Sequence, residues 1–70
     1  RLADAGALDE ALAPLLAFLD AAPTSADGHA LAGIVFAARG ERAAALRHLR
    51  KALYLNPADE ASRVHLEHLL

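Results

Sequence analysis

The segment GERAAALRHLRKALYLNP, from Gly40 to Pro57, begins with a glycine, ends with a proline and carries an apolar stripe between them. The segment GALDEALAPLLAFLDAAP, from Gly6 to Pro23, has the same plan 34 positions earlier. At this offset four further pairs coincide: Ala11 with Ala45, Leu12 with Leu46, Leu15 with Leu49, and Leu19 with Leu53. A period of 34 residues with two helices per unit is typical of a helix–turn–helix solenoid.

The composition of the 70-residue chain narrows the fold class and the function. Alanine and leucine supply 33 residues, which favours helices, and the absence of cysteine excludes disulfides and thiolate zinc sites. A net charge of −2 argues against a nucleic-acid partner. No run without polar side chains is longer than Ala30–Ala38, which is far shorter than the roughly 20 residues that cross a bilayer. Because no basic and apolar leader opens the chain either, we expect an all-α cytoplasmic protein without membrane insertion.

Turn signals predict four helices. The signals are Gly6, residues 23–25, Gly40, and Asn56 with Pro57. The first helix is predicted over about residues 7–22, with a kink or a local loosening at Pro14 and a stripe formed by Leu8, Leu12, Leu15, Leu16 and Leu19. The second follows residue 23, with Thr24 and Asp27 as a capping box, and its body at residues 30–38 has no polar face. A helix that is apolar all round must be covered on more than one side.

The third predicted helix, over about residues 41–55, is amphipathic. Its expected buried stripe consists of Ala45, Leu46, Leu49, Ala52 and Leu53. Arg47, Arg50 and Lys51 form a basic outer face, which is either simply solvated or binds an acidic partner or phosphate. A fourth helix is predicted to begin with Asn56 as its cap and Pro57 in the first helical position, and to continue to the end of the chain.

Residues 26–59 resemble one complete tetratricopeptide (TPR) repeat. The matching residues are Gly33, Phe36, Gly40, Ala45, Leu49, Ala52 and Pro57. The sequence departs from the family at His29, where tryptophan is usual, and at Ala32, where leucine is usual. Residues 1–25 resemble most of a preceding repeat, with Phe18 in place of its second alanine, and residues 60–70 resemble the opening helix of a following one. The resemblance implies an all-α solenoid of antiparallel helix hairpins, with about two repeats and four helices.

The run LRKALYLNP, residues 49–57, also resembles a segment common in TPR domains joined to chemotaxis receptor methyltransferases of the CheR type. This narrower resemblance implies that the chain is a carboxy-terminal module of a methyltransferase that uses S-adenosylmethionine. A longer TPR array is the alternative parent. Since no glycine-rich loop follows a strand here, we expect neither catalysis nor a cofactor in this segment.

The TPR resemblance implies a function in binding a protein or peptide partner. The inner, concave surface of such a solenoid would include Ala30, Ile34, Ala37, Ala38, Val64, His65 and His68. An apolar groove of this kind suits an extended or helical peptide with aliphatic anchors. Because Ala30 and Ile34 stand where TPR domains that grip acidic tails carry lysine and asparagine, we expect no such clamp. The alternative is that Ile34 and Val64 simply pack on each other.

Four histidines raise the question of a metal site. His65 and His68 lie three positions apart on one predicted helix, which is only half of a zinc site. His29 and His48 belong to other predicted helices, so we expect no metal site and a pair that faces solvent or the groove.

The second class of function is self-assembly. Two repeats with unfinished ends expose apolar surface, which a homodimer or a longer array would cover. The expected adhesive edge is the last helix, with Leu66, Leu69 and Leu70.

Overall fold

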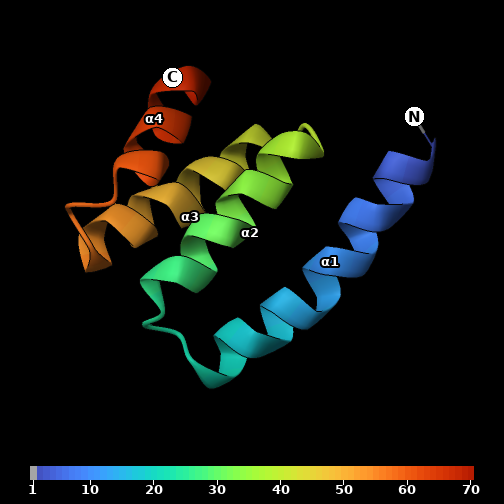
Figure 1. The fold of residues 1–70 in the computed structure, drawn as a ribbon, viewed down its shortest axis with the longest axis horizontal. Coiled ribbons are helices and arrows are strands. Elements are labelled where there is room, and N and C mark those ends of the chain that lie inside the picture. The colour runs from blue at the N-terminus through green and yellow to red at the C-terminus, as the bar shows by residue number, and fades with distance from the viewer. Residues whose placement is uncertain (1) are drawn as a thin grey trace.

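The computed structural model describes the backbone of residues 2–70 and the side chains of residues 6–70. Its four helices pack as successive antiparallel neighbours (Figure 1). Their bounds are Leu2–Ala21 (α1), Ala26–Ala38 (α2), Arg42–Leu55 (α3) and Glu60–Leu69 (α4). The α2–α3 hairpin is central, with α1 packed on α2, and α4 packed on α3 and touching α2. The described residues contain no strand, so the predicted all-α hairpin fold is confirmed. No helix in this part of the chain is long and apolar enough to span a bilayer.

The backbone repeats with the 34-residue period of the sequence at the two corners that contain Pro23 and Pro57. The helices before these corners end 34 positions apart, at Ala21 and Leu55, and the helices after them begin 34 positions apart. The same turn closes both corners: the Ser25 amide donates to the Ala22 carbonyl, and the Asp59 amide to the Asn56 carbonyl, each at 3.1 Å. The two corners are therefore structurally equivalent.

The helix caps are equivalent too, although they are not the residues that the sequence predicts. Ser25 Oγ accepts the Gly28 amide at 3.0 Å, and Asp59 Oδ1 accepts the Ser62 amide at 3.3 Å. Ser62 Oγ also donates to Asp59 Oδ2 at 2.8 Å, and these hydrogen bonds lower the pKa of the Asp59 carboxyl group.

The capping roles predicted for Thr24 and Asn56 are therefore wrong. The Asn56 amide donates to the Ala52 carbonyl and makes Asn56 the last cap of α3, so it cannot also begin α4. Pro57 consequently lies in the turn rather than in the first helical position.

The two aligned glycines adopt different conformations. Gly40 has a φ of +83°, a left-handed conformation that favours glycine, and it reverses the chain between α2 and α3. Gly6 lies inside α1, so the turn predicted there is wrong. Alanines at positions 5 and 7 favour helix on both sides of it, and an added Cβ at Gly6 would meet nothing within 4 Å. α1 also continues past Pro14, which is exposed.

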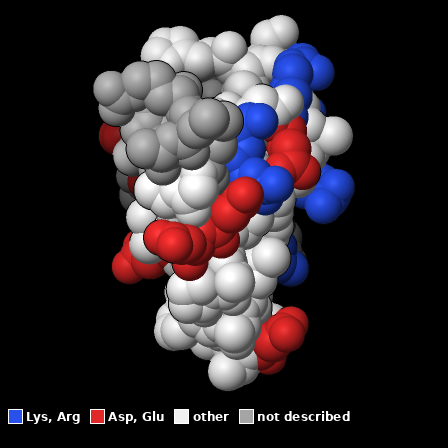
Figure 2. Space-filling view, turned by 90° about the vertical axis from the view of Figure 1, so that its right-hand side faces the viewer, with Lys and Arg blue, Asp and Glu red and all other residues white. Residues whose placement is uncertain are grey.

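The described side chains of α1 contact α2 along one side of the helix. Leu12 and Leu19 are buried, and a Cβ on Gly28 of α2 would lie 2.7 Å from Leu19 Cδ2. An ion pair between Asp9 Oδ1 and Arg39 Nε, 3.2 Å apart, adds a contact between α1 and the end of α2. Of the predicted stripe, Leu8 and Leu15 are half-buried and Leu16 is exposed. Figure 2, which looks onto the α1 side of the molecule, shows uncharged surface over much of this side.

The core lies between α2 and α3. Ala45, Leu46, Leu49 and Ala52 are buried as predicted, and Leu53 is half-buried. A Cβ on Gly33 would lie 2.6 Å from Leu49 Cγ and 3.3 Å from the Ala45 carbonyl oxygen. The close approach of the two helices therefore depends on the absence of a side chain at Gly33.

Replacing the helical glycines Gly33 and Gly6 with alanine should change stability in opposite directions. Gly33→Ala forces a methyl group against Leu49, and we expect the free energy of unfolding to fall by about 1–2 kcal/mol despite alanine's better helix propensity. Gly6→Ala adds the same group where nothing is near and should raise the free energy of unfolding by about 0.5–1 kcal/mol. Urea denaturation of both variants measures this, and equal signs would contradict the packing described.

Candidate partner-binding surfaces

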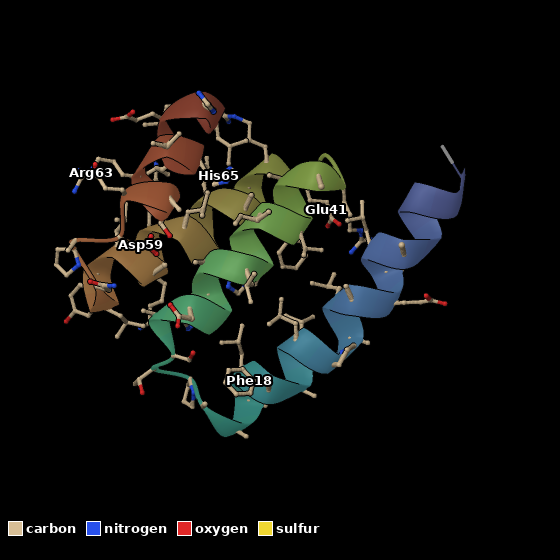
Figure 3. The ribbon with its side chains drawn as sticks, viewed as in Figure 1. Phe18, Glu41, Asp59, Arg63 and His65 are labelled. Atoms are coloured by element: carbon tan, nitrogen blue, oxygen red, sulfur yellow. The ribbon has the colours of Figure 1, made fainter. Side chains whose placement is uncertain are left out.

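The predicted groove residues lie on α2 and α4, which touch each other. On α2, Ala30, Ile34 and Ala37 are half-buried and Ala38 is exposed. On α4, His65 is half-buried and lies on the side that faces α2 (Figure 3), while Val64 and His68 are exposed. The seven side chains include no carboxylate, lysine or arginine, so this surface offers mainly apolar contact.

The sequence prediction overlooked one large apolar side chain on the same helix. Leu31 is 53% exposed, although it follows Ala30 directly. Its spacing from Ile34 and Ala38 is i, i+3 and i+7, which places the three on one side of α2. This helical spacing could have identified Leu31 as part of the same surface from the sequence alone.

Arg42 links the start of α3 to the end of α4. Its Nε donates to the Leu69 carbonyl at 2.6 Å, so the first residue of α3 binds the last residue of α4. A guanidinium group at a helix carboxyl end also complements the helix dipole.

Histidines 29 and 48 form a cluster that joins α2 to α3. Their rings stack with centroids 5.4 Å apart, and His48 also stacks on Phe36 at 5.3 Å. Because the Pro23 carbonyl can only accept, His29 Nε2 donates to it at 2.8 Å. Nδ1 of neutral His29 then accepts Nδ1–H of His48 at 3.1 Å. Burial, followed by the nearby His29 and Arg47, lowers the pKa of His48.

The structure keeps the two histidine pairs apart. His29 and His48 bond to each other between α2 and α3, whereas His65 and His68 lie on α4. Among the side chains of residues 6–70, no group of three or more histidines, cysteines, aspartates or glutamates could hold a metal ion.

The basic outer face lies on α3. Arg47, Arg50 and Lys51 are all exposed, and Lys51 Nζ lies 5.6 Å from the centroid of the Tyr54 ring, which is itself 79% exposed. These cations belong to a different helix from the predicted groove, which is on α2 and α4.

The chain is similar to part of a methyltransferase. It is 40% identical over 70 residues to the probable biofilm formation methyltransferase WspC of Pseudomonas putida. The alignment includes 100% of this chain and 16% of that protein, so the chain spans about one sixth of the relative's length. No family model and no solved structure matches the chain. The match agrees with the predicted link to a larger methyltransferase.

The His29–His48 cluster predicts a pH-dependent stability. As the pH falls below 6.5, the ordinary pKa of His48, the unfolded chain binds a proton there that the folded chain does not, so the free energy of unfolding decreases. The free energy of unfolding stops decreasing once the pH is below the lowered pKa that His48 has in the folded chain. His48→Phe, which keeps an aromatic ring against Phe36, should flatten this part of the pH profile.

Urea denaturation between pH 7.5 and 5 measures the profile. The matched control is His68→Phe, which changes an exposed histidine on another helix and should keep the wild-type slope. An equal slope in wild type and His48→Phe would contradict the assignment to His48.

Proposed function

We propose that this chain is a TPR-type interaction module of a larger cytoplasmic signalling protein related to chemotaxis receptor methyltransferases. The support is threefold: the corners recur with a period of 34 residues, glycine at the family's small position permits the close α2–α3 contact, and the relative is a methyltransferase. In this proposal the module recruits the methyltransferase to its site of action.

We infer that catalysis and S-adenosylmethionine binding belong to another part of the parent protein. Residues 2–70 form helices and turns, whereas a methyltransferase domain of the usual type binds its cofactor at a glycine-rich loop after a strand. The aligned 16% of the relative therefore represents an accessory segment in this proposal.

The surface proposed for partner binding is the groove on α2 and α4. The observation that carries it is the exposure of apolar side chains on two touching helices: Val64 is 46% exposed, and Ile34 is only half-buried. If these two residues served only to pack on each other, less of Val64 would remain accessible. An extended or helical peptide with aliphatic anchors would cover them.

Glutamate substitution at the groove tests this function. Peptides selected from a random display library on the wild-type chain should bind at least about tenfold more weakly to the double variant Ile34→Glu/Val64→Glu, because carboxylates then replace the apolar anchor site. Fluorescence anisotropy with labelled peptides measures the change. Circular dichroism verifies that the variant is folded.

The control is Tyr54→Glu, which places one carboxylate on the exposed face of α3 and should leave affinity unchanged. Equal affinity of the folded double variant and the wild type would show that the groove is not the binding surface.

A further inference from the structure

Positive charge is concentrated on α3, the helix that packs against both α2 and α4 (Figure 1). It contains four of the chain's seven lysines and arginines and none of its nine aspartates and glutamates. The other three cations and all nine carboxylates lie elsewhere in the chain. The net charge of −2 therefore combines one positive helix with an otherwise negative chain.

The basic outer face of α3 continues into an exposed aromatic ring. Arg47, Arg50, Lys51 and Tyr54 have the helical spacing i, i+3, i+4 and i+7, so they form one stripe about 10 Å long, which we call the basic stripe. Tyr54 lies two positions after the buried Ala52, about 200° around the helix axis. The basic stripe therefore lies on the side of α3 opposite the core.

The cations of the basic stripe have no charged partner among the described residues. The other arginines of this part of the chain are engaged: Arg39 and Arg63 form ion pairs with carboxylates, and Arg42 donates to a backbone carbonyl. Cations three and four positions apart on a helix repel each other. The last turn of α3, where a cation would complement the helix dipole, contains none. Neither ion pairing within the described residues nor the helix dipole accounts for the stripe.

The 34-residue repeat indicates that the basic stripe stays uncovered when a further repeat follows it. The equivalent positions on α1 are all exposed although a complete repeat follows them: Ala13, Leu16, Ala17 and Asp20. Within the described residues, α1 and α3 do not touch each other. A helix one repeat after α3, packed in the same way, would not touch α3 either. The exposure of the stripe is therefore a property of the repeat.

We propose that the basic stripe binds an acidic helical segment of a partner protein. Carboxylates three and four positions apart on a helix are about 5–6 Å apart, as the three cations are, whereas side chains on one side of a strand are about 7 Å apart. Each guanidinium group can bind a carboxylate through two hydrogen bonds. An apolar side chain one turn further along the partner helix would pack on the ring of Tyr54, which is 79% exposed.

A short protein segment fits this surface better than a nucleic acid or an anionic bilayer does. Both of those polyanions present charge over an area much wider than a stripe on one helix. They would also approach the carboxylates of the neighbouring helices, which repel them. The exposed carboxylates of α1 and α4 are Asp9, Glu10, Asp20, Glu60 and Glu67.

Two labelled, alanine-based helical peptides test the proposal by fluorescence anisotropy. The first has glutamates at i, i+3 and i+4 and a leucine at i+7, and the second has the same composition with its glutamates distributed around the helix. At about 50 mM salt we expect the wild-type chain to bind the first peptide about tenfold more tightly, because only this peptide can pair three carboxylates with the three cations at once. Equal affinity for the two peptides, or no binding of the first, would overturn the proposal.

Neutral variants locate the binding site. Arg50→Gln/Lys51→Gln should weaken binding of the first peptide at least about fivefold, because two of the three ion pairs are lost. The matched control Arg39→Gln/Arg63→Gln removes the same charge outside α3 and should stay within about twofold of wild type. Circular dichroism verifies that both variants are folded. Equal losses in the two variants would show unspecific attraction and refute a site on α3.

The other classes of anion are tested with two probes, oligothymidine and vesicles made of equal parts of phosphatidylserine and phosphatidylcholine. We expect the wild-type chain to bind both more weakly than the first peptide. Tighter binding of either probe, lost in Arg50→Gln/Lys51→Gln, would assign the stripe to a nucleic acid or a lipid surface and overturn the proposal.

The basic stripe and the groove on α2 and α4 can be tested independently. Ile34→Glu/Val64→Glu changes the groove and leaves α3 intact, so this variant should bind the first peptide within about twofold of wild type. A loss as large as that in Arg50→Gln/Lys51→Gln would place the acidic peptide in the groove and refute its assignment to α3. Either proposal can therefore fail without the other.

Discussion

The close contact between Gly33 and Leu49 is the constraint on which the rest of the fold depends. With no side chain at position 33, the α2 backbone lies against the Leu49 side chain and the Ala45 carbonyl. That approach buries Ala45, Leu49 and Ala52 completely without a large aromatic core. A chain of this size buries limited apolar area, so dispersion contacts between closely spaced backbones matter more than in a larger domain.

Much of the helix architecture could be predicted because it follows from periodicity. The 34-residue repeat, the hairpin around Gly40 and the buried stripe of α3 all follow from spacing. The caps could not be predicted, since Thr24 and Ser25 both offer an oxygen and the geometry of the preceding turn decides which one reaches the free amide. The two aligned glycines show the same limit. The chain turns at Gly40 but stays helical at Gly6, because the neighbouring residues decide the conformation of a glycine.

The candidate surfaces were partly accessible to sequence reasoning. Helical spacing places Ile34 and its neighbours on one side of α2, but Leu31 was overlooked because the prediction followed the family's inner positions. The bond between His29 and His48 joins residues 19 positions apart on two helices, and its existence depends on the crossing of those helices rather than on any motif.

The two equivalent corners differ in the chemical group that caps the following helix, and this difference makes their stability respond differently to acid. Ser25 holds the first corner with a neutral hydroxyl, whereas Asp59 holds the second with a carboxylate whose pKa lies below its ordinary value of 3.8. As the pH falls through that lowered pKa, the carboxylate gains a proton and the second corner loses its stronger acceptor, while the first is unaffected. Strong acid should therefore begin to fray the molecule at the start of α4 and leave the junction of α1 and α2 intact longer.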